Sequence, residues 1–198
     1  MMFVLTGDVD ENKIRHAYSF DMDEAGPVLH VWYSVQQTHL VIPIVDGNDD
    51  AEESSIETEF FPEGGVTRTS SDLELYWDDA IQYVGVLFRD VQIPKGATID
   101  SEYIQFVCKS AGSDEMSIKI WGVDSVNVDS ILGIDYGVSA NEPTQATIDW
   151  SPAPWIVEFD AKPEERTPHL NTIINEIISN DGWEAGNNMM FVLTGDVD

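Results

Sequence analysis

The chain of 198 residues is long enough for one large globular domain, and 42% of its residues are hydrophobic, which is sufficient for a core. Its 37 Asp and Glu residues against 9 Lys and Arg residues give a formal net charge of −28. A surface this acidic repels the phosphates of nucleic acids and of anionic membranes, so we predict neither nucleic-acid binding nor membrane insertion. Six Trp, six Tyr and eight Phe residues argue against a disordered acidic chain.

The first predicted element is a strand over Phe3-Val4-Leu5, an apolar run closed by the turn signal Thr6-Gly7-Asp8. The ten residues MMFVLTGDVD at positions 1–10 return unchanged at positions 189–198. This repetition predicts one unit of a tandem array followed by the first residues of the next unit. A duplicated tag is the alternative, which the strand-like character of the segment disfavours.

Two copies of one strand compete for the same position in a sheet, because the side-chain pattern sets the register. We therefore predict that one copy completes this body and that the other completes a neighbouring body. The link is made either by covalent repeats or by strand donation to a sheet edge. The predicted junction strand comprises Met2, Phe3, Val4 and Leu5 with their duplicates Met190, Phe191, Val192 and Leu193.

Alternation of apolar and polar residues predicts half-buried strands over 14–22 and 27–35. An apolar run over 39–45 contains Pro43, which favours an edge strand. The segment 45–59 is acidic and is predicted to be a loop. Further strands at short spacing are predicted over 72–77, 83–88, 98–108, 116–122, 146–150 and 155–159, with a turn at 93–96 and an irregular segment over 127–141.

One amphipathic helix is predicted over about 168–179. Thr167 is a suitable N-cap and Pro168 a suitable first helical residue. The apolar stripe consists of Leu170, Ile173, Ile174, Ile177 and Ile178. Many short strands with one helix predict an all-β fold, a jelly-roll β-sandwich whose open end the helix covers.

Several short motifs occur in an order that resembles a known domain type. They are Gly96-Ala97-Thr98-Ile99, Tyr103-Ile104-Gln105-Phe106, Trp150 with Trp155, Thr167-Pro168-His169-Leu170, Gly182-Trp183 with Gly186-Asn187, then Arg15, Ala17-Tyr18-Ser19 and Pro27-Val28-Leu29. The succession resembles the tandem jelly-roll domains of large secreted bacterial surface proteins, which are similar in outline to carbohydrate-binding-module and DNRLRE-type sandwiches.

The resemblance implies that residues 1–198 form a single sandwich read circularly. Residues 1–34 would hold the last strands of the family domain, residues 35–188 its main body, and residues 189–198 the repeat that belongs to the next unit or its junction. It also implies an extracellular or cell-surface location.

A calcium site is predicted in the acidic segment. Asp46, Asn48, Asp50, Glu52 and Glu57 stand at positions 1, 3, 5, 7 and 12 of an EF-hand-like loop. Position 6 lacks the Gly that the sharp turn requires, which argues against a true EF-hand. Clustered carboxylates nevertheless repel one another unless a cation intervenes. The predicted ligands of a structural calcium ion are Asp46, Asn48, Asp49, Asp50, Glu52, Glu53 and Asp72; a solvated acidic loop is the alternative.

Catalysis has little support in the sequence. The four histidines are scattered, and no Ser-His-Asp, CxxC, HExxH or Gly-rich phosphate motif occurs. Pairs of carboxylates are inevitable among 37 acidic residues and therefore indicate nothing. Cys108 lies in a strand-like run and is expected to be a small buried hydrophobe. We predict that the protein is not an enzyme.

The predicted function is structural: a repeating unit of an extracellular filament or surface stalk, linked head to tail to other copies of itself by a shared strand and stabilised by calcium. The alternative is a carbohydrate-binding or adhesion module whose partner is a polysaccharide. Sugar rings stack on exposed aromatic side chains, and Tyr76, Trp77 and Trp121 are the predicted platform. Packing of these rings in the core is the competing interpretation.

Overall fold

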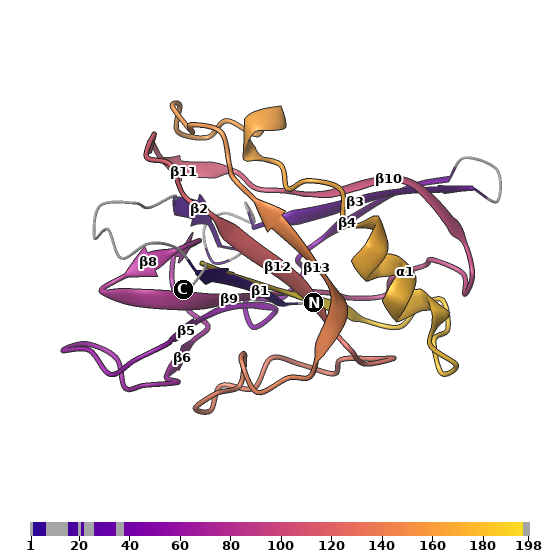
Figure 1. The fold of residues 1–198 in the computed structure, drawn as a ribbon, viewed down its shortest axis with the longest axis horizontal. Coiled ribbons are helices and arrows are strands. Elements are labelled where there is room, and N and C mark those ends of the chain that lie inside the picture. Colours follow the sequence, from indigo (N-terminus) through magenta and orange to yellow (C-terminus); the bar gives the residue numbers. More distant parts are fainter. Residues whose placement is uncertain (1, 7–15, 20, 22–25, 35–37, 196–198) are drawn as a thin grey trace.

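The computed structural model describes residues 2–6, 16–19, 21, 26–34 and 38–195. The strands form three sheets, and the only α-helix among the described residues is short (Figure 1). The prediction of an all-β sandwich with one helix is confirmed.

The large sheet has eight strands. Along its path they are β13 (Pro143–Trp150), β12 (Ile118–Val123), β14 (Met189–Gly195), β1 (Met2–Thr6), β9 (Ala80–Phe88), β5 (Asp50–Ser54) and β6 (Val66–Thr67), and β8 (Trp77–Asp78) pairs with β9 off this path. Eight of the nine residues of β9 are buried, because the strand is apolar on both faces and lies inside the sheet.

Two three-stranded sheets form the opposing layer. One has the order β10 (Thr98–Gln105), β3 (Val28–Ser34) and β4 (Thr38–Pro43), and the other β11 (Cys108–Ser110), β2 (His16–Tyr18) and β7 (Asp72–Glu74). Figure 1 shows the β10-β3-β4 sheet above the large sheet. Buried aliphatic and aromatic side chains from both layers form one continuous core. Pro43 lies on an edge strand, as predicted.

Helix α1 (Asn171–Ser179) closes one end of the sandwich beside β13, β10 and β12, after a 3-10 turn, η1 (Pro163–Glu165). Its buried side chains are Ile173, Ile174, Ile177 and Ile178, as the stripe predicts. The packing is close: a Cβ atom at Gly122 of β12 would lie 2.7 Å from Cγ2 of Ile173.

The predicted start of the helix is wrong, because α1 begins at Asn171 and not at Pro168. The hydroxyl of Thr167 accepts a hydrogen bond from the Ile104 amide at 3.0 Å, so it supports β10 instead of capping the helix. The buried carboxylate of Glu102 takes the capping role, since the backbone N–H groups of Leu170 and Asn171 hydrogen-bond to it.

The outer edge of the large sheet at β13 is partly covered by the same helix. The Glu176 carboxylate accepts hydrogen bonds from the backbone amides of Gln145 and Ala146 at 2.7 and 2.8 Å. The opposite edge is β6, which is only two residues long. Short or covered edges offer little backbone for another strand to pair with.

Two element predictions are wrong. The acidic segment predicted as a loop contains strand β5, all five residues of which are buried. The strand predicted over 155–159 is irregular: Trp155 forms an isolated bridge with Gly112, and Phe159 adopts a φ of 67°. Of the strand predicted over 14–22, the described residues show only His16–Tyr18.

Candidate functional site

The strongest candidate site is the place in the large sheet where the two copies of the repeated segment meet. Strand β14 is buried along its whole length and pairs antiparallel with β12, so that Phe191 lies opposite Gly122 and Leu193 opposite Ile120. Its first residues also pair with β9, through Met189 opposite Phe88. A strand this apolar is stable only inside a sheet that is covered on both faces.

Strand β1 lies between β14 and β9. It runs parallel to β14 over five residue pairs, from Met2 opposite Phe191 to Thr6 opposite Gly195. The register is offset by one residue, since Met2 lies level with Phe191 and not with its own duplicate, Met190. On its other side β1 pairs antiparallel with β9 through only two residue pairs.

The junction residues are therefore brought together in one sheet of one chain. We predicted that only one copy fits this body and that the other lies in a neighbour; in the single chain both copies lie in one sheet, and the share of a neighbouring copy stays a prediction. The two copies avoid competing for one position because the gap between β14 and β9 widens after Met190 and admits β1 as an additional strand.

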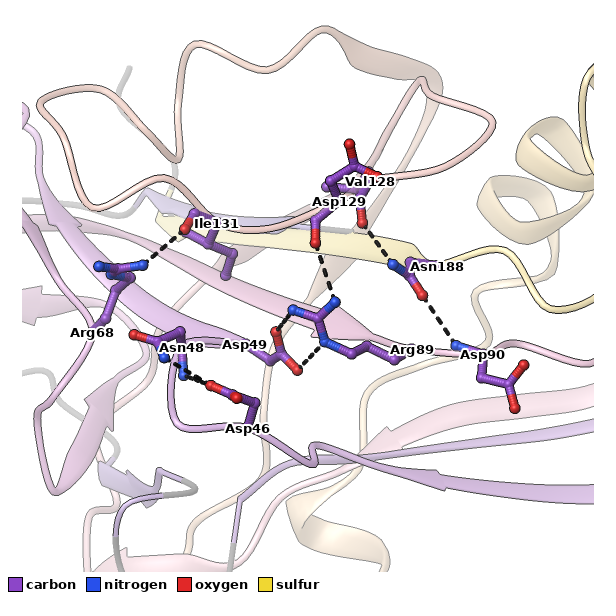
Figure 2. A network of polar contacts seen from close by, with 10 residues as sticks. All are labelled: Asp46, Asn48, Asp49, Arg68, Arg89, Asp90, Val128, Asp129, Ile131 and Asn188. Atoms are coloured by element: carbon purple, nitrogen blue, oxygen red, sulfur yellow. Dashed lines mark hydrogen bonds and ion pairs between the residues drawn. The ribbon is translucent and has the colours of Figure 1, made fainter.

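The predicted calcium loop is divided among separate contacts. The Asp46 carboxylate accepts hydrogen bonds from the backbone and side-chain amides of Asn48, both at 2.8 Å, and these bonds lower its pKa. Asp49 is fully buried and receives two N–H groups of Arg89, at 2.6 and 2.5 Å (Figure 2). Burial raises the pKa of Asp49, and the hydrogen bond and charge of Arg89 oppose this shift.

Arg89 also donates to the backbone oxygen of Asp129 at 3.1 Å, and Asn188 donates to that of Val128 at 3.0 Å (Figure 2). These bonds fasten the irregular segment that follows β12 to the start of β14. Asp49 and Arg89 thus connect three parts of the chain, which is a structural role.

The remaining predicted ligands lie on strands, where successive side chains point to opposite faces. The Glu53 carboxylate accepts hydrogen bonds from the backbone amides of Val138 and Ser139 at 2.8 and 2.9 Å. Burial raises its pKa, and these hydrogen bonds oppose the shift. Asp50 is also buried, and Asp72 forms an ion pair with Lys109 at 2.7 Å.

Glu52 faces a small polar hollow lined also by Glu74, Asp78 and Gln82. Its Oε1 accepts a short hydrogen bond from the backbone amide of Glu74. The pKa of Glu52 lies well above the ordinary value, first because the group is buried and then because the Glu74 carboxyl adjoins it. Burial and the neighbouring Glu74 carboxyl thus both favour the protonated form of Glu52.

The seven predicted ligands do not converge on one point. Across the part of the chain that the structure describes, no three His, Cys, Asp or Glu side chains gather closely enough to hold a metal ion. A calcium ion held by this set of residues therefore stays a prediction.

The predicted aromatic platform is also dispersed. Tyr76 is completely buried, so its ring presents no face to a sugar, and this part of the prediction is wrong. Trp77 and Trp121 are half-buried on β8 and β12 and pack against the core. Their packing agrees with the competing interpretation.

A different aromatic cluster, which we did not predict, lies on the outer face of the β10-β3-β4 sheet. Trp32 and His39 stack with ring centroids 4.3 Å apart and an interplanar angle of 7°. His30 stacks on Tyr103 at 4.8 Å, and the guanidinium of Arg166 lies 4.5 Å from the Tyr103 ring centroid. Burial, followed by the charges of His39 and Arg166, lowers the pKa of His30.

The sequence contained one signal for this cluster. His30 and Trp32 alternate on one face of a strand, but the partners on β4 and β10 follow from pairing, which places Trp32 opposite His39 and His30 opposite Tyr103. The cluster borders a hollow lined by Trp32, His39, Asp100 and Ser101. Aromatic faces beside a carboxylate and a hydroxyl are groups that a polar ring-shaped ligand can contact.

No protein-family model, no curated protein and no solved structure matches the chain. Among the described residues, no helix has the length and hydrophobicity needed to cross a membrane.

Proposed function

We propose that the protein is a structural unit that assembles head to tail with copies of itself, strand β1 of one copy pairing with β14 of the next. The observation that carries the proposal is the β1–β14 ladder, in which two strands of identical sequence lie parallel in one sheet. A position that accepts this sequence from its own chain accepts it equally from a second copy.

The pairing of β1 supports exchange. Five residue pairs join β1 to β14, whereas two join it to β9. Most of its backbone pairing is thus with its own duplicate, which every copy of the protein carries. The resemblance to secreted surface domains supports an extracellular filament or stalk as the form of the assembly.

A matched pair of variants tests the proposal, because Val4 and Val192 are the same residue of the two copies. Proline removes a backbone donor and disrupts an interior strand. Val4→Pro is expected to keep the fold but to abolish the oligomers that light scattering detects at high protein concentration. Val192→Pro is expected to unfold the chain, because β14 is buried and pairs with three strands.

Cross-linking identifies which chain supplies the strand. Leu5 and Thr194 are paired residues, so their Cα atoms are close enough for a disulfide in a Leu5→Cys, Thr194→Cys variant. Disulfides between molecules are expected to increase with protein concentration, and Leu5→Cys alone serves as the control. Disulfides formed only within single chains at every concentration would contradict strand exchange.

We propose that calcium acts only where two copies meet, by reducing the repulsion between units that each carry a charge of −28. Calcium chloride is expected to promote assembly more than magnesium or sodium chloride at equal ionic strength, and a chelator is expected to reverse it. Equal effects of the three salts would reduce the role of calcium to screening.

The second candidate function is carbohydrate binding, which the Trp32–His39 cluster favours over the platform we predicted. The test is titration with soluble polysaccharides, monitored by tryptophan fluorescence. Trp32→Ala is expected to abolish a response and Trp77→Ala to leave it unchanged, since Trp77 packs against the core. The absence of any response in the wild-type protein would remove this candidate.

A further inference from the structure

We infer that β9 is an acceptor for two competing strands: β14 closes onto β9 when β1 leaves, and a β1 strand from a second copy must displace β14 to enter. The identity of the incoming strand rests on the proposed function. The closure concerns one chain alone and is tested separately.

The register of β14 supplies the first evidence. Met189 lies opposite Phe88 and Met190 opposite Leu87 in an antiparallel ladder. In such a ladder each step forward on one strand is a step backward on the other. Continued along β9, the same register places Val192 opposite Gly85.

By the same rule Leu193 would lie opposite Val84. These two positions of β9 are the ones that β1 occupies, since Met2 lies opposite Gly85 and Phe3 opposite Val84. The two copies of the repeated segment therefore compete for the same backbone groups of β9.

The direction in which the backbone hydrogen-bonding groups of β9 point favours the closure of β14 onto β9. The amide of Leu87 donates to the backbone oxygen of Asp49 at 2.7 Å, on the side of β5. Peptide groups alternate in direction along a strand, so those of Val84 and Val86 point to the opposite side, toward β1 and β14. After β1 leaves, these buried groups need new partners, and β14 supplies them by extending its ladder.

The packing around Gly85 allows this movement. A Cβ atom at Gly85 would lie 3.5 Å from Cε of Met190, so β14 already contacts this part of β9. Ile131 and Val138 lie at 3.3 and 3.4 Å from the same point and cover the sheet there. Closure shifts β14 across a gap one strand wide, beneath a cover that is already present.

The consequence for assembly is that the acceptor is never an open groove. A donor strand must displace β14 from β9, so its binding is slow. The exchange favours a donor strand that pairs with β9 as well as β14 does. The chemical class of partner is thus an extended apolar segment with the sequence Met-Phe-Val-Leu-Thr, the sequence of β1 itself.

Nuclear magnetic resonance on the dilute, monomeric full chain tests closure. In an antiparallel ladder the non-hydrogen-bonded pairs bring Hα atoms close, and Gly85 occupies such a position. Its Hα is expected to show an NOE to Met2 in the wild type and to Val192 in the Val4→Pro variant. The amides of Val84 and Val86 are expected to stay protected from hydrogen exchange in both proteins.

Loss of that protection in Val4→Pro, without an NOE between Gly85 and Val192, would overturn the closure. If this variant does not fold, hydrogen exchange of the wild type decides. The Val84 amide is then expected to be protected at least tenfold more than the amide of Val4, because β14 covers it when β1 opens. Equal protection would overturn the inference.

A synthetic peptide of residues 1–10 tests the partner. Added to Val4→Pro, it is expected to return the Gly85 NOE from Val192 to the peptide methionine, slowly and in saturable fashion. The same peptide with Pro at its fourth position is the control and should have no effect. Closure without peptide binding would overturn the partner and the proposed function together, while leaving the closure itself intact.

Discussion

At the scale of single residues, the acidic groups of this protein fall into those that face water and those that the fold has enclosed. Asp49, Glu52, Glu53 and Glu102 are all buried, and each has a specific cation, carboxyl group or set of backbone amides beside it. An enclosed carboxylate without such a partner is strongly unfavourable. These positions are therefore where substitutions have the largest effects.

Arg89→Met is expected to lower the free energy of unfolding by about 3 kcal/mol, because it leaves the buried Asp49 carboxylate unpaired. This loss is in the lower part of the range for a broken buried ion pair, because the Arg89 side chain is 34% exposed. Urea denaturation measures the change. Lys95→Met is the control: its ion pair with Asp181 is exposed, and no measurable loss is expected. A loss of equal size in both variants would contradict the special role of Asp49.

Glu52→Gln is expected to remove a pH dependence. The raised pKa means that the folded chain keeps a proton on Glu52 that the unfolded chain releases above the ordinary pKa of a glutamate. Wild-type stability contributed by Glu52 is therefore complete in acid and is lost as the pH rises through the folded-state pKa. Glu74 and Asp72 face the same group and oppose its ionisation.

The measurement is urea denaturation of both proteins between pH 4 and pH 9, a range set by the ordinary glutamate pKa of about 4.3. Glu52→Gln is expected to equal the wild type in acid and to exceed it in base. Exposed Glu57→Gln is the control and should follow the wild-type curve throughout. If the free energy of unfolding of the wild type instead increased relative to that of Glu52→Gln as the pH rises, the ionised form of Glu52 would be the stabilising one.

At the scale of elements, the structure shows which sequence patterns are sufficient and which are not. Alternation and apolar runs predicted the strands that became β3, β9 and β12, and the isoleucine stripe predicted the buried face of α1. Strand β5 escaped prediction because its Asp-Ala-Glu-Glu-Ser sequence is acidic, and its burial depends on partners from other segments, such as the Val138 and Ser139 amides that donate to Glu53.

The candidate site was predicted in part. The repeated decapeptide and its strand character follow from the sequence alone, but its two copies could only be placed side by side once the widening between β14 and β9 was known. The stacking of Trp32 on His39 likewise depends on the pairing of β3 with β4, which a single sequence does not specify.

The buried Glu102 carboxylate lies at the start of α1 and accepts hydrogen bonds from backbone amides there. Glu102→Ala removes the carboxylate that receives the first helical amides, and it is expected to cost about 1 kcal/mol, as a lost N-cap does. Thermal denaturation followed by circular dichroism measures it. The control Glu115→Ala changes an exposed glutamate outside the helix and should have little effect. An unchanged melting temperature in Glu102→Ala would show that packing alone fixes the helix.

At the scale of the whole molecule, the net charge of −28 is the dominant quantity. Like charges on a compact surface repel more strongly than on an expanded chain, and salt screens this repulsion. The melting temperature is therefore expected to rise steadily between 0.05 and 1 M potassium chloride, concentrations between which the Debye length falls from above about 10 Å to about 3 Å. A melting temperature that falls over this range would show that ion pairs such as Asp49–Arg89 outweigh the repulsion.

Both edge strands of the large sheet, β13 and β6, are protected from pairing, and this affects the shape of any polymer. The Glu176 carboxylate occupies the amides of Gln145 and Ala146, and the far margin ends in the two residues of β6. Sideways fusion of molecules into broad, amyloid-like ribbons is thereby discouraged. In the proposed assembly, growth is expected at the interior of the sheet, where each molecule engages one successor, and the polymer would be a thin, unbranched thread with a defined polarity.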